Sequence, residues 1–314
     1  MEEALYSQFG FFNTDLVRSA KKGDFLTSPE VSIYFGKILR NWINTSCNLN
    51  KIVEIGSGTG SLIEQIGIKE ITAIELSSTA REELINKGIM THTNVNELTL
   101  EKSELVFGNE ILDNIPCSIG IYRDKVWYEK VVAIQENSFS YDIKPIRNEE
   151  LDWINKNNIV PNEDHELEIQ VNIDKFLNTV IKKISPKNIL LFDYGYEQAN
   201  REKRKYNSLL RTYKNHHLSV DPIEDPGNID ITYDVNFSSL SRELKTLGYD
   251  VTLKLQRNFL LENGFDIIFD ELQEKYLVAE GMEKLKINSE LNGLKAIVDL
   301  NGLGGFYCLN AQKL

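Results

Sequence analysis

Three alternate glycines follow a strand-like apolar segment early in this sequence. Residues 51–60 read Lys-Ile-Val-Glu-Ile-Gly-Ser-Gly-Thr-Gly, and residues 71–75 read Ile-Thr-Ala-Ile-Glu. Glycines let the backbone turn sharply after a strand, and an acid at the end of the next strand can accept hydrogen bonds from ribose hydroxyls. The pattern therefore predicts half of a nucleotide-binding α/β sheet. The alternative, a glycine-rich turn with no ligand, does not explain the acids at both Glu54 and Glu75.

The spacing of the glycines distinguishes between nucleotide ligands. A dinucleotide site has the pattern Gly-x-Gly-x-x-Gly, whose last glycine packs the helix onto the strand. Here the pattern is Glu-x-Gly-x-Gly-x-Gly, which is the usual form of a class I S-adenosyl-L-methionine (SAM) site and favours SAM over NAD as cofactor. The predicted cofactor-binding residues in this region are Glu54, Gly56, Ser57, Gly58, Thr59, Gly60, Glu75 and Leu76.

The composition excludes several classes of partner. The chain has 314 residues and a net charge of −12, whereas a general nucleic-acid binder needs a basic face, so we expect no nucleic-acid partner. No apolar run is long enough to span a bilayer and the first residues show no signal-peptide pattern, so we expect no membrane insertion. The three cysteines and four histidines match no metal-ligand spacing. We therefore expect a reduced, cytoplasmic protein without a metal site.

Strand-like and helical segments alternate up to Pro116, and this alternation predicts a parallel sheet with crossover helices. After Pro116 the pattern changes to short segments typical of antiparallel strands. We predict an α/β fold, a class I Rossmann-like sheet with an N-terminal helical segment and an inserted α+β region. The predicted divisions are a helical extension packed on the core (1–50), a SAM-binding core (51–116), an inserted acceptor-side region (117–187), and the remaining core sheet with C-terminal strands (188–314).

Two local predictions concern the ends of the chain. Ser28-Pro29-Glu30 is a helix-start pattern, and the apolar residues that follow recur at helical spacing, which predicts one helix over about 29–44. Residues 297–300 and 305–309 are both apolar, and we expect them to form a closing hairpin.

A group of polar residues follows the strand-like segment 104–108. Asn109, Glu110 and Asp113 lie at the end of this segment, on the edge of the predicted sheet that also carries the glycine loop. In a parallel sheet this is the edge at which ligands bind, so these residues are candidates to face the reacting groups. The structural alternative is that Asn109 and Glu110 cap a helix while Asp113 is solvated.

Several separated motifs together resemble the MidA-type family of SAM-dependent methyltransferases, over nearly the whole chain. The motifs are Ala4-Leu5-Tyr6 with Phe9 to Phe12, Gly23 to Glu30 with Phe35-Gly36, Glu54 to Gly60, Glu75-Leu76-Ser77, Asn109-Glu110-x-x-Asp113-x-x-Pro116, Asp193-Tyr194-Gly195, Leu210-Arg211-x-Tyr213 with His216, Pro226-Gly227, Asp230-Ile231-Thr232 and Val235-x-Phe237. Two departures from the family pattern are Ser57, where proline is common, and Ile111-Leu112, where an aromatic pair is common.

The resemblance implies methyl transfer from SAM to a protein arginine, because mitochondrial members of the family are complex I assembly factors that dimethylate an arginine of a complex I subunit. Glu110 and Asp113 would then hold the guanidinium as a carboxylate clamp, and Asn109 would position the reacting groups and contact SAM. The resemblance implies that Ser28, with Asp24 and Glu30, closes over the SAM or acceptor pocket, although helix capping explains Ser28 equally well. The residues expected to line the acceptor channel are Asp193, Tyr194, Arg211 and Tyr213. His216 is a further candidate, although a surface pair with His217 is the favoured alternative for it.

Two other functions are compatible with the same motifs. The first is SAM-dependent methylation of a small molecule or RNA, although the acidic charge disfavours RNA. The second is an assembly factor that binds SAM without turnover, which the carboxylates at 110 and 113 disfavour because a scaffold needs no acid pair at the methyl group. The sequence specifies neither the acceptor residue nor the oligomeric state.

Overall fold

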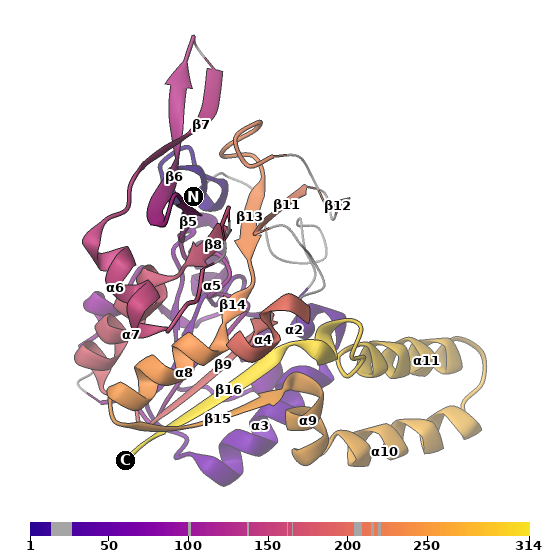
Figure 1. Cartoon of the computed structure of the whole chain (residues 1–314). Coiled ribbons are helices and arrows are strands. Elements are labelled where there is room, and N and C mark those ends of the chain that lie inside the picture. Colours follow the sequence, from indigo (N-terminus) through magenta and orange to yellow (C-terminus); the bar gives the residue numbers. More distant parts are fainter. Residues whose placement is uncertain are drawn as a thin grey trace.

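The computed structural model describes residues 1–13, 27–99, 102–136, 138–161, 163–164, 166–203, 209–214, 217–218 and 221–314. At its centre is a seven-stranded sheet in the order β15-β16-β9-β4-β1-β2-β3 (Figure 1). Its strands are β1 (Ile52–Ile55), β2 (Ile71–Ile74), β3 (Met90–His92), β4 (Leu105–Asn109), β9 (Asn188–Asp193), β15 (Tyr249–Leu255) and β16 (Tyr307–Lys313). The first five pair in parallel, and β16 pairs antiparallel with both β9 and β15. The predicted Rossmann-like α/β class is confirmed.

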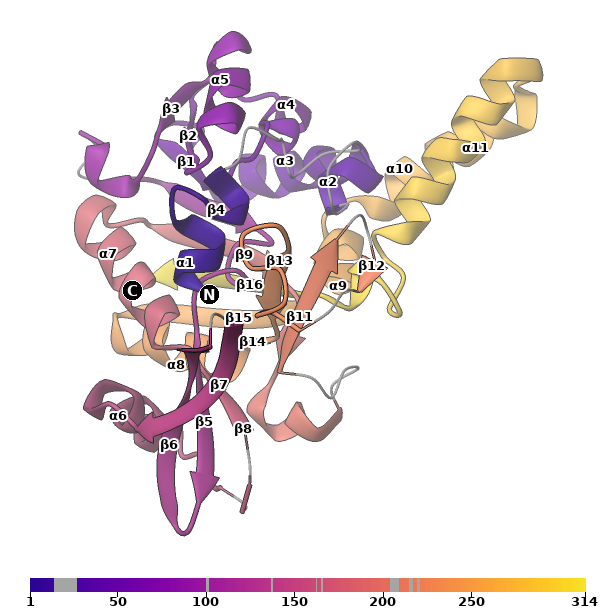
Figure 2. The same ribbon diagram turned by 90° about the horizontal axis from the view of Figure 1, so that it is seen from above.

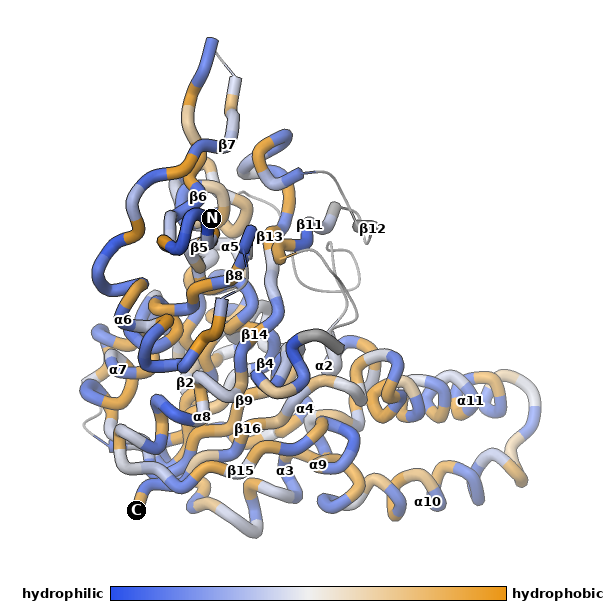
Figure 3. The backbone as a smooth tube through the Cα atoms, in the orientation of Figure 1, coloured by the Kyte–Doolittle hydropathy of each residue, from blue (hydrophilic) through white to orange (hydrophobic). Residues whose placement is uncertain are grey.

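Alternate residues of the central strands pack on opposite faces of the sheet, as the pleat of a strand requires. In β4, Leu105 and Phe107 join one core cluster while Val106 joins another. In β9, Leu190 and Phe192 face the first cluster while Ile189 faces the opposite side. Both faces are therefore covered, and the strands of the centre carry mainly hydrophobic residues (Figure 3).

Helices cover the two faces of the sheet in two groups. Residues of α3 (Tyr34–Ser46), α4 (Ser61–Ile66), α9 (Gln256–Glu262), α10 (Phe265–Val278) and α11 (Gly281–Ala296) share one core cluster with the sheet. Residues of α7 (Val171–Ile184) and α8 (Phe237–Thr246) pack on the opposite face. The remaining helices are α1 (Glu2–Tyr6), α2 (Ser28–Val31), α5 (Ser78–Asn86) and α6 (Asn148–Lys156).

Between β4 and β9 the chain builds a separate antiparallel sheet in the order β7-β6-β5-β8. Its strands are β5 (Ser118–Arg123), β6 (Val126–Gln135), β7 (Ser138–Pro145) and β8 (Glu166–Ile169). Trp127 of β6 and Trp153 of α6 are both buried in its small core. The chain returns to the central sheet through α7, so that β4 and β9 are neighbours although 78 residues separate their ends.

Short pairings and two projecting features complete the fold. β11 (Leu210–Lys214) lies between β12 (His217–Leu218) and β13 (Asp230–Tyr233), and β10 (Gly195–Tyr196) pairs with β14 (Val235–Asn236). Viewed from above, α10 and α11 extend from the body as a helical hairpin, while β5 and β6 extend from a different side (Figure 2). The short 3-10 helices are η1 (Phe11–Asn13), η2 (Val95–Glu97), η3 (Gln198–Lys203) and η4 (Leu303–Gly305).

The two local predictions at the chain ends are corrected. The expected helix over 29–44 is two helices, because Ser32 is extended (φ −146°) and its hydroxyl accepts a hydrogen bond from the backbone N–H of Tyr34 at 3.3 Å. The expected hairpin is wrong: Ile297 is the C-cap of α11, and the strand that begins at Tyr307 pairs with β9 and β15 instead. Apolar composition predicted burial for both segments but could not identify their pairing partners.

Candidate functional site

A cavity of about 710 Å³ opens at the carboxyl ends of the parallel strands. The chain runs from β1 to β2 and β3 on one side and then returns to β4 on the other side of β1, and ligands bind at such a switch point. Most of the predicted site residues line this one cavity: Glu54, Gly56, Ser57, Gly58, Thr59, Glu75, Leu76, Asn109 and Glu110. Gly60, Ser28 and Asp113 are not part of its lining.

The backbone of the glycine loop favours glycine at each of its three alternate positions. Gly56, Gly58 and Gly60 have φ values of +70°, +51° and +84°, in the left-handed region that side chains disfavour. A Cβ on Gly56 would lie 2.2 Å from Cγ2 of Ile111. The loop is fixed to β2 because the backbone N–H groups of Gly56 and Ser57 both donate to the carbonyl of Ile74, at 2.9 and 3.3 Å.

Glu75 connects the glycine loop to the end of β2. Its Oε2 accepts a hydrogen bond from the backbone N–H of Gly58 at 2.8 Å, and its Oε1 accepts one from Ser77 at 2.8 Å. Burial raises the pKa of the Glu75 carboxyl, and these backbone N–H groups partly oppose that shift. Each carboxylate oxygen can accept a second hydrogen bond, so Glu75 can hold the loop and a ligand hydroxyl at once.

Two buried oxygen atoms in the cavity wall have no hydrogen-bond partner within the described part of the chain. They are Oε2 of Glu54 and Oδ1 of Asn109. Burial raises the pKa of the Glu54 carboxyl well above its usual range, and the charge of Glu75 adds to the effect. Unpaired acceptors of this kind suit a ligand that carries hydrogen-bond donors and positive charge. The ammonium and sulfonium of SAM meet that requirement, so the residues fit the cofactor.

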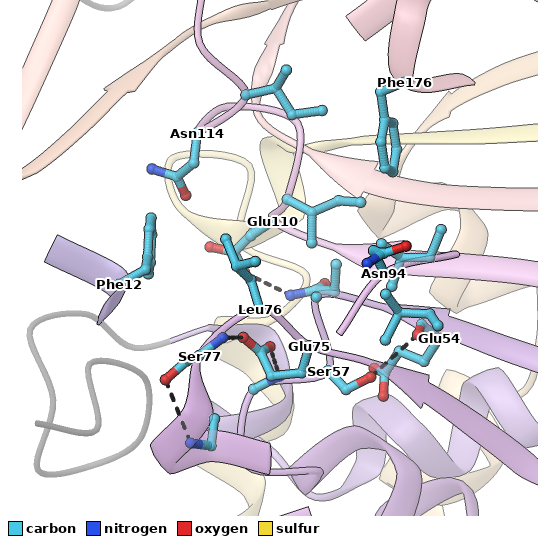
Figure 4. A pocket seen from close by; sticks show the side chains of 18 of the residues that line it. Phe12, Glu54, Ser57, Glu75, Leu76, Ser77, Asn94, Glu110, Asn114 and Phe176 are labelled. Atoms are coloured by element: carbon cyan, nitrogen blue, oxygen red, sulfur yellow. Dashed lines mark hydrogen bonds between the residues drawn. The ribbon is translucent and has the colours of Figure 1, made fainter. Parts of the chain in front are cut away.

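Glu110 is held in an unusual backbone conformation at the cavity. Its φ is +52°, which is uncommon for a residue other than glycine. Its Oε1 accepts hydrogen bonds from Nδ2 of Asn109 at 2.9 Å and from the backbone N–H of Ser28 at 3.3 Å. Burial, reinforced by the charge of Asp113, raises the pKa of Glu110 to about 8. Figure 4 shows the Glu110 side chain at the centre of the cavity.

The structure separates Asp113 from Glu110. Asp113 is 3% exposed, and its Oδ2 accepts a hydrogen bond from the hydroxyl of Tyr194. The ring of Tyr194 in turn lies 4.7 Å from the guanidinium of Arg211, which pairs with Asp234 at 2.8 Å. Burial raises the pKa of Asp113 to about 6, although the Tyr194 hydrogen bond and the charge of Arg211 act in the opposite direction. Asp113 therefore belongs to a buried network outside the cavity lining.

The other residues expected around the acceptor have mixed positions. Ser28 is fully buried, and its hydroxyl is hydrogen-bonded to Gln256 at 3.2 Å. Glu30 lines the cavity and also caps α2, because its Oε2 accepts a hydrogen bond from the N–H of Thr27 at 3.0 Å. Asp193 is buried and accepts hydrogen bonds from backbone N–H groups. Asp24 and His216 lie outside the described residues.

Sequence patterns missed part of the cavity wall. The segment after β3 and the inner face of α7 contribute residues that no motif contained: Thr93, Asn94, Val95, Asn96, Phe176 and Thr179. Tyr6 and Phe12 also line the cavity, and they belong to the opening motif although no site role was expected of them. The strand β3 is only three residues long and not strongly apolar, so its end carried no recognisable signal. The position of the segment after β3 follows only from the topology of the parallel sheet.

Comparisons with known proteins agree with this geometry. Residues 36–253 match a family described as S-adenosyl-L-methionine-dependent methyltransferases. The mitochondrial protein arginine methyltransferase NDUFAF7 homolog of Caenorhabditis elegans is 25% identical, covering 83% of this chain and 70% of its own length. The NDUFAF7 protein of Rattus norvegicus is also 25% identical, covering 81% of this chain and 67% of its own length. A Burkholderia thailandensis protein, solved bound to S-adenosyl-homocysteine, shares the fold with a TM-score of 0.85 and 22% identity over 99% of this chain and 86% of its own.

The expectation of a cytoplasmic setting is contradicted, because the NDUFAF7 relatives are mitochondrial proteins. That expectation depended on cysteine content, and thiols stay reduced in more than one compartment. Among the described residues, no helix is both long and apolar enough to cross a membrane, and no group of three or more potential ligands could hold a metal ion.

Proposed function

Because the chain belongs to a family of S-adenosyl-L-methionine-dependent methyltransferases, we propose that it transfers the methyl group to an arginine of a protein. The observation that carries this proposal is the Glu110 carboxylate in the wall of the cofactor cavity. The relatives named as protein arginine methyltransferases support it, although at 25% identity.

The cofactor supplies an activated methyl group on a sulfonium. The residues that would hold it are the loop Gly56–Gly60, Glu54, Glu75 and the segment Thr93–Asn96, all at the carboxyl ends of β1, β2 and β3. Transfer from a sulfonium is an in-line displacement, so the work of the protein is orientation and electrostatics.

Glu110 has the chemistry that a guanidinium acceptor needs. A guanidinium is protonated at any ordinary pH, and its delocalised nitrogens are poor nucleophiles. A carboxylate hydrogen-bonded to two of its nitrogens fixes the plane and draws positive charge away from the attacking nitrogen. A bound guanidinium also favours the ionised form of Glu110, which reverses the effect of burial on its pKa. Asn109 and Ser28 hold this carboxylate in place.

In this proposal Asp113 does not hold the guanidinium, although its position in the motif suggested that role. Because it lies in the buried network with Tyr194, it acts on Glu110 through its charge and is a positioning residue. The resemblance to the MidA-type family makes a respiratory complex I subunit the first acceptor protein to test.

The test is methyl transfer from labelled SAM into a lysate of cells that lack the gene, with the modified residue mapped by mass spectrometry. Label on methylarginine in one or a few proteins is the expected result and identifies the acceptor. The Glu110→Gln variant should lose transfer and keep its affinity for S-adenosyl-homocysteine. Label on RNA or a small molecule would refute the arginine assignment, and tight cofactor binding without any label would favour an assembly factor.

A further inference from the structure

An aromatic pair from the N-terminal segment lines the same cavity as Glu110. Tyr6 is the last residue of α1 and Phe12 lies in η1. Their rings are stacked, with centroids 5.5 Å apart and an interplanar angle of 22°. The end of α1 and the following 3-10 helix therefore place two aromatic rings in the cavity wall.

This aromatic surface is a built wall, because the segment that carries it is anchored from behind. Leu5 and Phe11 are fully buried and form a core cluster with Ile229 and Ile231. Such packing fixes the path of the backbone on both sides of the pair. Phe9 belongs to the same segment, but its side chain is 79% exposed and takes no part in the wall.

Hydrogen bonds reinforce the position of Tyr6. Its hydroxyl donates to the backbone carbonyl of Asn114 at 3.1 Å, and its own carbonyl accepts from Nδ2 of Asn13 at 2.8 Å. Asn114 follows β4 in the turn that begins with Glu110 and lines the cavity too. The aromatic wall is thus connected to the same turn that carries the carboxylate.

The cavity has two differently lined sides. In Figure 4, Phe12 and Asn114 lie on one side of Glu110, while Glu54, Asn94 and Phe176 lie on the other. Glu54 and Asn94 belong to the edge of the sheet that fits the cofactor. Leu76 and Ser77 also lie toward Phe12, so this second side adjoins the cofactor residues while lying away from Glu54 and Asn94, and an acceptor can reach Glu110 from it.

The chemistry of this second side selects a planar cation. Aromatic faces attract cations, and carboxylates pair with them. Besides Glu110, the carboxylates of Glu2 and Glu30 line the cavity, whereas Lys175 is a lining cation whose Nζ is paired with Glu149 at 2.6 Å.

We infer that Tyr6 and Phe12 form the aromatic wall of the acceptor subsite, against which the guanidinium of the substrate arginine stacks while Glu110 binds its edge. The inference rests on the proposed arginine methylation. It assigns acceptor recognition to the N-terminal segment. A flat, delocalised guanidinium can stack on an aromatic ring and form an ion pair with Glu110 at once, whereas the uncharged urea of citrulline gains neither the cation–π attraction nor the ion pair.

The test compares Phe12→Leu with Phe9→Leu. Both variants exchange a phenylalanine for an apolar side chain in the same segment, but only the first removes an aromatic face from the cavity. Binding is measured calorimetrically, in protein saturated with S-adenosyl-homocysteine, for a glycine-rich peptide with one arginine and for counterparts with citrulline or lysine. The affinity of Phe12→Leu for the arginine peptide should fall by roughly 2- to 30-fold. The thermal unfolding of this variant and its affinity for S-adenosyl-homocysteine should remain those of the wild type.

The outcomes separate this subsite from the proposed function. Equal binding of the arginine peptide by both variants would overturn the aromatic wall, even if the wild type methylates arginine. Wild-type protein that binds arginine and citrulline peptides equally would overturn it as well. Selective, Phe12-dependent binding without any transfer of label to arginine would support the subsite and refute the proposed activity.

Discussion

Replacing Gly56 with alanine should destabilise the protein because two separate costs meet at this position. The backbone has φ +70°, and an L-residue in the left-handed region costs about 1–2 kcal/mol. The new Cβ would also lie 2.2 Å from Cγ2 of Ile111, and relieving such overpacking costs about 1–3 kcal/mol. We therefore expect Gly56→Ala to lose about 2–5 kcal/mol of unfolding free energy. The displaced loop should also bind S-adenosyl-homocysteine more weakly.

Gly88→Ala is the matched control. Gly88 has φ +74°, but a Cβ there would meet nothing within 4 Å, so only the conformational cost of about 1–2 kcal/mol applies. Urea unfolding of both variants gives the comparison, since a lower midpoint at unchanged slope reports lost stability. In a double-mutant cycle, Ile111→Ala should recover the part due to the clash. A Gly56→Ala variant no less stable than Gly88→Ala would refute the close approach described here.

Three further substitutions test the carboxylates. Glu110→Gln should raise stability at pH 8 by about 2 kcal/mol. This gain is less than the full shift of the pKa from 4.5 to about 8 implies, because Glu110 is half-buried and solvent partly screens its charge. Burial costs nothing while the group is protonated, so this gain should vanish near pH 4, as urea unfolding across pH would show. Tyr194→Phe should destabilise the fold by about 1–3 kcal/mol, because the Asp113 carboxylate loses the hydroxyl that donates to it. The loss should be larger at pH 8, where Asp113 is ionised, than at pH 5. Equal losses at both pH values would contradict this. Glu75→Gln should weaken S-adenosyl-homocysteine binding roughly tenfold or more in a calorimetric titration, since two backbone N–H groups lose a charged acceptor.

The cofactor half of the site could be predicted from sequence because its determinants are local. Gly56, Gly58 and Gly60 report backbone angles that few other residues adopt, and Glu75 follows directly after a buried strand. The carboxyl ends of parallel strands meet at one edge, which is enough to bring Glu110 to the same cavity.

The parts of the site that could not be predicted depend on tertiary contacts and on the direction in which side chains point. The motif places Asp113 three residues after Glu110, but the intervening turn is not helical, and the side chain points to Tyr194 instead of the cavity. The wall formed by Tyr6 and Phe12 requires the packing of α1 against the segment that contains Ile229, a contact between residues more than 200 positions apart. No periodicity within either segment encodes such a contact.

The long helices α10 and α11 were missed for another reason. Their buried residues are few, and large apolar side chains such as Leu277 and Met282 are exposed near the connection between them. The amphipathic pattern is therefore weak, and the helices are held mainly by packing near their other ends.

The backbone at Glu110 has a consequence for the engineering of this enzyme. A carboxylate at φ +52° is maintained against its own conformational preference, whereas glycine would adopt the same angle without strain. Any selection for heat resistance alone should therefore enrich glycine at position 110. A library screened for survival and not for turnover would converge on well-folded proteins that have lost the carboxylate proposed to bind the acceptor, so this codon should be held fixed before such a screen begins.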